Sequence, residues 1–365
     1  MKNLLLWALS LSLFAATATA QSSYSLETFY QYQPALEHRV DQIFQTLSDT
    51  QRVGQMIIPS VGKLGKPEAY VANLVRKGQA GGILLLGGSK EGFTEQVRRL
   101  NKIAQDNRQL PIMFSTDAEP TLLPKKISGA TPVPKTSALR NQEEAGMVAS
   151  TISQDLLDIG VRHNFAPVAD LSKNQEIIGA RSFGANPDTV AAMNWAFMRA
   201  SQRAGVVATA KHFPGHGLVQ GDSHHKLVFI NGPMQEVDVY RPLIDSGVVS
   251  VMVGHIAVEN NPDYNTNGEA ASTSHRIVTE LLKNELGFRG LVVTDAMNMG
   301  AVSQDPQATV KAVKAGCDMI LMPPNEPLLL NGVLAAMQKD PAFRDQVYAS
   351  VKKIIRLKLC LGLIQ

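Results

Sequence analysis

The segment at positions 205–217 reads GVVATAKHFPGHG, and it decides our prediction of the fold. Gly205 precedes an apolar run at 206–210, and a glycine in this place is typical of a helix that ends just before a buried strand. Lys211 and His212 follow the run, and Pro214-Gly215 excludes a continuing helix. The segment therefore predicts a buried strand that ends in a polar loop. Such loops are where functional sites are expected.

The same succession of a short apolar run and a longer amphipathic run recurs along the chain. The apolar runs are nearly continuous, as expected of parallel strands buried on both faces. Eight of them lie at 55–59, 82–87, 111–115, 161–168, 206–210, 250–254, 291–294 and 319–322. Helical patterns lie at 35–47, 66–77, 91–106, 142–159, 187–204, 234–244 and 275–286. The alternation predicts an α/β fold, a (β/α)8 TIM-type barrel. A doubly wound open sheet is the alternative that the apolar runs leave open.

The first twenty residues have the composition of a signal peptide. Lys2 supplies the positive charge, residues 4–14 are apolar, and Ala18-Thr19-Ala20 matches the small-residue cleavage pattern. The apolar stretch is too short to span a membrane, and no later stretch is long and apolar enough. We therefore expect cleavage after Ala20, a periplasmic or secreted protein with no membrane span, and a single domain over residues 21–365.

The formal net charge is +3, and basic and acidic residues are interspersed, so the composition gives no sign of nucleic-acid binding. The two cysteines, Cys317 and Cys360, have two interpretations. They are either buried thiols that behave as small apolar residues or, in an oxidising compartment, a disulfide.

Titratable residues follow five consecutive apolar runs. They are Asp117, Asp170, Lys211 with His212, His255 and Asp295. In a barrel all of these positions lie on one rim, around one pocket. Asp295 directly follows four apolar residues, and a carboxylate there is either a nucleophile or base, or the N-cap of the next helix.

Asp222-Ser223-His224 is a second candidate for chemistry. Residues two apart share a side of an extended segment, so the carboxylate could hold the imidazole in one tautomer, and such a histidine can donate and recover a proton near neutral pH. A solvated surface loop is the alternative.

His212, His216, Asp222, His224 and His225 are also suitable metal-ligand types. The Phe-Pro-Gly between His212 and His216 removes the helical spacing of a metal motif, and we expect no metal.

Taken together, these segments resemble glycoside hydrolase family 3, specifically its single-domain bacterial β-N-acetylglucosaminidases. The run at 211–217 followed by Asp222-Ser223-His224 is highly specific to that branch. The other matching segments lie in order over most of the chain, at 81–86, 116–119, 164–170, 178–184, 251–255, 285–295 and 315–319. The resemblance implies that residues 21–365 form a (β/α)8 catalytic domain and that the protein is an exo-β-N-acetylglucosaminidase, a glycoside hydrolase. Together with the signal peptide, it predicts an exported enzyme that removes terminal N-acetylglucosamine from peptidoglycan fragments or chitin oligomers.

The resemblance also implies roles for individual residues. Asp295 resembles the nucleophile of a retaining mechanism with a covalent glycosyl intermediate, His224 its acid/base, and Asp222 the partner of His224. Matching positions for substrate binding are Asp117, Arg181, Lys211, His212 and His255. The family implies no metal and no organic cofactor. We expect a monomer whose partner is its carbohydrate substrate.

One segment departs from the family pattern. After Glu119 the family continues toward an arginine that holds outer hydroxyls of the sugar, whereas residues 120–126 here read PTLLPKK. Lys125 or Lys126 could replace that arginine, as a point charge rather than a fork.

Two other functions stay open. A phosphorylase is one, because a histidine acid/base does not repel phosphate, and a catalytically weak cell-wall-binding protein is the other.

Overall fold

The computed structural model describes residues 24–364. The predicted signal peptide, residues 1–20, lies outside this range. Within the described range, no helix combines the length and the apolar character that crossing a membrane requires.

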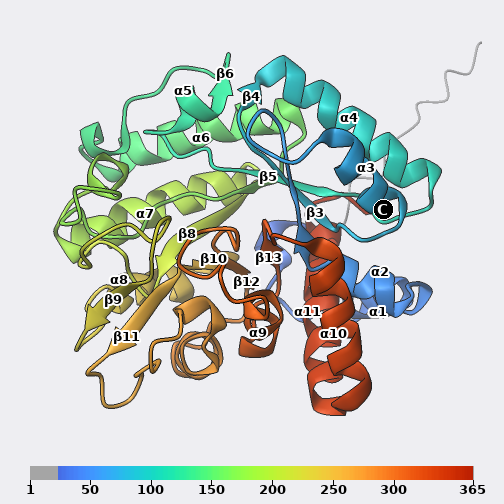
Figure 1. The fold of residues 1–365 in the computed structure, drawn as a ribbon. Coiled ribbons are helices and arrows are strands. Elements are labelled where there is room, and N and C mark those ends of the chain that lie inside the picture. Colours follow the sequence, from blue (N-terminus) through green and yellow to red (C-terminus); the bar gives the residue numbers. More distant parts are fainter. Residues whose placement is uncertain (1–23, 365) are drawn as a thin grey trace, which may run out of the picture.

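A curled parallel sheet with helices around it forms the centre of the molecule (Figure 1). Seven strands are hydrogen-bonded in the order β12-β10-β8-β7-β5-β3-β2, and every pair is parallel. Their bounds are β2 (Ser60–Val61), β3 (Gly82–Leu85), β5 (Met113–Thr116), β7 (His163–Asn164), β8 (Val207–Phe213), β10 (Ser250–Val253) and β12 (Leu291–Thr294). The α/β class and the parallel sheet are thus confirmed.

The remaining pair, β1 (Ile57–Ile58) and β13 (Ile320–Leu321), lies between the two edges of this sheet. The N–H of Thr294 donates to the carbonyl of Met319 at 3.1 Å, which joins β12 to β13. Pro59 separates β1 from β2, and its carbonyl accepts from the N–H of Leu84 at 2.9 Å. Hydrogen bonds therefore connect both edges through β13 and β1, and each of the eight predicted apolar runs contains a strand.

Helices connect successive strands, and all seven predicted helical patterns contain one. They are α1 (Pro34–Thr46), α3 (Glu68–Arg76), α4 (Lys90–Asp106), α6 (Gln142–Ile159), α7 (Pro187–Arg203), α8 (Val237–Asp245) and the π-helix η5 (Arg276–Glu285). Gly160 and Gly205 have φ of 92° and 86°, the left-handed backbone that glycine adopts after a helix. The other helices are α2 (Asp49–Gly54), α5 (Leu123–Lys126), α9 (Ala308–Ala315), α10 (Glu326–Lys339), α11 (Pro341–Cys360) and the 3-10 turns η1 (Leu26–Thr28), η2 (Thr136–Ala138), η3 (Gly179–Arg181) and η4 (Ala271–Thr273).

Two short parallel pairs lie outside the central sheet. They are β4 (Gly88–Ser89) with β6 (Ile127–Ser128), and β9 (Val228–Asn231) with β11 (Ile256–Glu259). Each of these strands comes soon after a strand or helix of the central unit. The loops at the carboxyl ends of β8 and β10 are therefore tied to each other by β9 and β11, which lie together in Figure 1.

The amino ends of several strands meet at Lys358 of α11. Its buried ammonium donates to Gln55 Oε1 at 2.7 Å and to the carbonyls of Gly81 at 2.8 Å and Pro111 at 2.7 Å. These three groups precede β1, β3 and β5. Burial lowers the pKa of Lys358 to about 7. The side chain thus fixes the last helix to the end of the sheet opposite the polar loops.

The two cysteines do not form a disulfide. Cys317 and Cys360 are both buried, and both are free thiols. The apolar-thiol interpretation of the sequence is the one that this structure supports.

Candidate active site

A cavity of about 570 Å³ opens at the carboxyl ends of the strands. Six of the eight predicted site residues line it: Asp117, Arg181, Lys211, His212, His224 and Asp295. Lys211 and His212 lie near the carboxyl end of β8, Asp295 follows β12, and Asp117 follows β5. The positions come from far apart in the sequence and meet because parallel strands present their carboxyl ends on one side. Of the predicted rim residues, Asp117, Lys211, His212 and Asp295 therefore meet in one pocket, whereas the fully buried Asp170 and His255 do not line it.

Lys211 lines the cavity and is almost fully buried between two carboxylates. Its Nζ is 2.9 Å from Asp117 Oδ1 and 2.6 Å from Glu119 Oε1. Arg181 contacts Glu119 in a bidentate manner, with Nε and Nη2 each at 2.8 Å from a carboxylate oxygen. Such paired hydrogen bonds fix the planes of both groups. Glu119 is thus the centre that orients Arg181 and Lys211.

The sequence did not single out Glu119 as a site residue. Burial acts to raise its pKa, but the charges of Arg181 and Lys211 outweigh burial and hold the pKa far below its usual range. Glu119 is therefore ionised. Its position two residues after Asp117 was the available signal, but nothing in the sequence showed that it is 1% exposed and shared by two cations.

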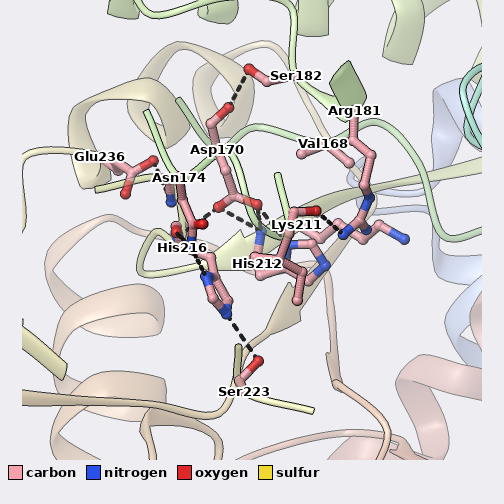
Figure 2. A network of polar contacts seen from close by, with 12 residues as sticks. Val168, Asp170, Asn174, Arg181, Ser182, Lys211, His212, His216, Ser223 and Glu236 are labelled. Atoms are coloured by element: carbon pink, nitrogen blue, oxygen red, sulfur yellow. Dashed lines mark hydrogen bonds and ion pairs between the residues drawn. The ribbon is translucent and has the colours of Figure 1, made fainter. Parts of the chain in front are cut away.

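Asp170, which does not line the cavity, holds His212 by its side chain (Figure 2). Its Oδ2 is 2.6 Å from His212 Nδ1, and its oxygens also accept from the backbone N–H of His212 and of His216. Asp170 is fully buried, so these contacts replace its lost hydration. With Nδ1 engaged, Nε2 is the ring nitrogen of His212 left for a ligand.

Asp295 lies where an ionised carboxylate is favoured. Burial acts to raise its pKa, but His212, His255 and the N–H of Ala296 outweigh burial and lower the pKa to about 2. The Ala296 N–H donates to Asp295 Oδ1 at 2.7 Å. No helix starts here, because α9 begins only at Ala308. The N-cap interpretation of Asp295 is therefore wrong, and the carboxylate faces the cavity.

Asp222 and His224 form a close pair on the loop after β8. Asp222 Oδ1 is 2.6 Å from His224 Nδ1 and accepts the backbone N–H of His224 at 2.8 Å. The His224 side chain is 56% exposed, whereas that of Asp222 is 21% exposed. Burial acts to raise the pKa of Asp222, but the contacts with His224 outweigh it and lower the pKa. Asp222 does not line the cavity itself and contacts His224, which does.

His255 is placed differently from the other predicted site residues. It is fully buried, with Nδ1 2.8 Å from Ser272 Oγ and Nε2 3.1 Å from the carbonyl of Ala296. It does not line the cavity and lies behind the residue that follows Asp295. Burial lowers the pKa of His255. Its contacts in this structure are to the protein wall.

Lys126 of α5 occupies the segment in which the chain departs from the family pattern. Its Nζ is 3.8 Å from Asp117 Oδ2, and the side chain lines the cavity. Lys125 does not line the cavity. Of the two lysines suggested by the sequence, Lys126 is thus the one that can reach a ligand.

The five candidate metal ligands do not converge. His216 and His212 are held by Asp170, whereas Asp222 pairs with His224. Over residues 24–364, no group of three or more His, Cys, Asp or Glu side chains is arranged to hold a metal ion.

Comparison with known proteins gives the same family along most of the chain. Residues 49–357 match the Glycosyl hydrolase family 3 N terminal domain. Beta-hexosaminidase A of Pseudoalteromonas piscicida is 29% identical over 282 residues, which are 69% of this chain and 47% of that protein. A beta-N-acetylglucosaminidase/beta-glucosidase of Cellulomonas fimi is 30% identical over 336 residues, which are 87% of this chain and 58% of that protein.

Among solved structures, a glycoside hydrolase family 3 beta-N-acetylglucosaminidase from Paenibacillus sp. str. FPU-7 superposes with a TM-score of 0.80 at 30% identity. The similarity covers 87% of this chain and 63% of that one. The chain thus spans about half the length of the first two relatives and less than two thirds of the third. The family match over residues 49–357, together with the cavity at the strand ends, shows that this chain belongs to glycosyl hydrolase family 3.

Proposed function

We propose that the protein is an exported, retaining exo-β-N-acetylglucosaminidase. One observation carries the proposal: His224 and the ionised Asp295 line the same cavity, and Asp222 Oδ1 orients His224 through a 2.6 Å contact to Nδ1. A nucleophile and a proton donor on opposite sides of one glycosidic bond are what a retaining glycosidase needs. Relatives called beta-hexosaminidase or beta-N-acetylglucosaminidase support N-acetylglucosamine as the sugar that is cleaved.

The reaction has two displacements. In the first, an Asp295 carboxylate oxygen attacks the anomeric carbon, the bond from that carbon to the leaving oxygen breaks, and protonated His224 gives its Nε2 proton to the leaving oxygen. In the second, neutral His224 takes a proton from water while the water oxygen attacks the anomeric carbon. The bond to Asp295 then breaks, and the carboxylate and the protonated His224 are regenerated.

The remaining groups of the cavity suit a sugar with several hydroxyls. Lys211 and Arg181 are fixed by Glu119, and Asp117 is fixed by Lys211, so donors and acceptors are oriented before a ligand arrives. His212 presents its Nε2 on the same wall. We assign these residues to hydroxyl recognition in the subsite of the cleaved sugar.

The proposal extends to architecture and location. We infer a complete (β/α)8 barrel, on the support of the hydrogen bonds that connect β12 through β13 and β1 to β3. We also infer a monomer, cleavage of residues 1–20 and a periplasmic or secreted location, where peptidoglycan fragments are the expected substrate and chitin oligomers the second choice. Mass spectrometry of the protein purified from the producing cells tests the cleavage: a mature chain that begins at Gln21 supports it, and one that begins at Met1 contradicts it.

Release of p-nitrophenol from the β-N-acetylglucosaminide tests the activity. The wild type is expected to release it, and Asp295→Ala and His224→Ala are expected to reduce kcat. A wild type that binds muropeptides without turnover would instead support the cell-wall-binding alternative.

The same assay in millimolar phosphate decides between hydrolysis and phosphorolysis. His224 in the cavity lining keeps a phosphorylase in consideration, because an imidazole in the proposed acid/base role does not repel phosphate as a carboxylate would. Free N-acetylglucosamine as the main product supports the hydrolase, and sugar 1-phosphate as the main product supports the phosphorylase.

A further inference from the structure

The loop at 214–226, which we call the acid/base loop, connects β8 to β9 and carries Asp222 and His224. The half-exposed ring of His224 lies far along this loop. A long loop loses conformational entropy when it is fixed, so its reactive residue needs contacts that hold it over the cavity. The structure contains such contacts at the beginning of the loop, within it and at its far side.

The beginning of the acid/base loop is fixed by Glu236. Its Oε1 accepts the N–H of Leu171 at 2.7 Å and of Gly217 at 3.1 Å, and its Oε2 accepts the N–H of Leu218 at 3.0 Å. A Cβ on Gly217 would lie 1.9 Å from the carbonyl oxygen of Leu171. The loop can therefore pack this closely only because residue 217 is glycine.

His216 ties this fixed beginning to the catalytic pair (Figure 2). Its backbone N–H donates to Asp170 Oδ1 at 2.8 Å, and its ring Nε2 is 2.9 Å from Ser223 Oγ. His216 and Ser223 are both almost fully buried. Ser223 stands between Asp222 and His224 in the sequence. Asp170, which holds His212 at the sugar site, is thus connected through His216 to the residue in the middle of the catalytic pair.

The far side of the acid/base loop is held by hydrogen bonds to its backbone carbonyls. The N–H of Gly300 donates to the carbonyl of His224 at 2.9 Å, and Asn174 Nδ2 donates to the carbonyl of Gly221 at 3.2 Å. Gly300 lies in the segment that follows Asp295. The His216–Ser223 contact adds a buried side-chain tie to the residue that stands between Asp222 and His224.

We propose that His216 and Ser223 are positioning residues that hold the Asp222–His224 pair at the cavity that Asp295 also lines, where His224 exchanges a proton with the leaving oxygen and with water. Neither residue touches the substrate or the reacting atoms. The inference rests on the proposed function, because it concerns the proton-transfer step of that reaction. A small displacement of a catalytic group reduces the rate of the step that the group serves, and other steps are spared.

The test uses leaving groups of different acidity in Ser223→Ala, a variant that keeps Asp222 and His224. The value of kcat/KM reports the first displacement, in which 2,4-dinitrophenolate departs without a proton but the sugar of diacetylchitobiose needs one. We expect Ser223→Ala to lower kcat/KM for diacetylchitobiose by about 10-fold or more and to leave kcat/KM for the dinitrophenyl glycoside nearly unchanged. His216→Ala should show the same pattern, and the double variant should be no worse than either single variant.

Ser223→Thr keeps the hydroxyl and is expected to retain more diacetylchitobiose activity than Ser223→Ala. Ser201→Ala is the matched control, because it removes a buried hydroxyl of α7 for which no hydrogen-bond partner is found among the described residues. Equal losses on both substrates, or no loss on diacetylchitobiose, would overturn the inference while the proposed function stands. A wild type that cleaves neither substrate contradicts the proposed function, and the inference then falls with it.

Discussion

Asp222 fixes His224 through a single oxygen, Oδ1, which lies 2.6 Å from the ring Nδ1 and 2.8 Å from the backbone N of the same histidine. Because ring and backbone are bound to one atom, the imidazole cannot turn without breaking a charge-assisted contact. The Nδ1 proton is held on the Asp222 side, so Nε2 is the nitrogen that exchanges a proton with the substrate in the proposed mechanism.

Replacing Asp222 by Asn keeps the shape of the side chain and removes its charge. We expect Asp222→Asn to reduce kcat on an unactivated disaccharide by about 10²-fold, because the ring loses both its fixed tautomer and the charge that stabilises its protonated form. The Michaelis constant should change little, since Asp222 does not line the cavity. Steady-state kinetics check this, and a KM effect larger than the kcat effect would contradict the assigned role.

Glu119 is buried between two cations, so its substitution should affect both binding and stability. Glu119→Gln leaves Arg181 and Lys211 without their shared carboxylate, and breaking a buried ion pair costs about 3–5 kcal/mol. We expect a lower free energy of unfolding in urea and a higher KM. Glu95→Gln is the control, because that carboxylate is 69% exposed in an i,i+4 pair with Arg99 and its loss should change stability by less than about 0.5 kcal/mol. Equal effects of the two substitutions would contradict the account.

Glu236 predicts a pH dependence of stability. Burial, and next the charge of Asp170, raise the pKa of Glu236 from 4.5 to about 8. The folded state then binds this proton more tightly than the unfolded state, so the contribution to stability is complete below 4.5 and is lost as the pH rises through about 8. Glu236→Gln should therefore lose less stability than the wild type between about pH 5 and about pH 9 in urea titrations. Parallel pH profiles of the two proteins would contradict the prediction.

Lys126 is expected to contribute to ligand binding and Lys125 is not, although they are neighbours on α5. Lys126 lines the cavity next to Asp117, so we expect Lys126→Ala to raise KM by about 3- to 10-fold, the effect of one charge-assisted hydrogen bond in a partly exposed place. Lys125→Ala serves as the matched control. The prediction is wrong if both variants change KM equally or if kcat is the parameter that falls.

The sequence predicted the order of the elements because each strand is a nearly continuous apolar run, and the runs at 206–210 and 291–294 end at residues of the cavity. It also predicted Asp222 and His224 as a pair, because local spacing is enough to bring them together. The roles of Glu119 and Glu236 could not be predicted from the sequence in this way. A carboxylate shared by Arg181 and Lys211, or by three backbone N–H groups of distant loops, is recognised only when the tertiary contacts are known.

The sequence also did not predict that Pro59 divides β1 from β2, because an apolar run does not show where its hydrogen-bond partners change. The sequence also did not predict how His255 is placed. Its position after β10 predicted the rim, but the direction of its ring toward Ser272 and Ala296 depends on packing that the sequence pattern does not contain.

The most direct test of the mechanism is a search for the covalent intermediate. In His224→Ala, a 2,4-dinitrophenyl β-N-acetylglucosaminide should still be attacked, because its leaving group needs no proton, whereas release of the sugar should be slow without a base. Mass spectrometry of the quenched and digested protein is predicted to find one N-acetylglucosaminyl group on the peptide that contains Asp295, and none in the variant that also carries Asp295→Ala. An adduct on another residue, or continued turnover by the double variant, would contradict the account.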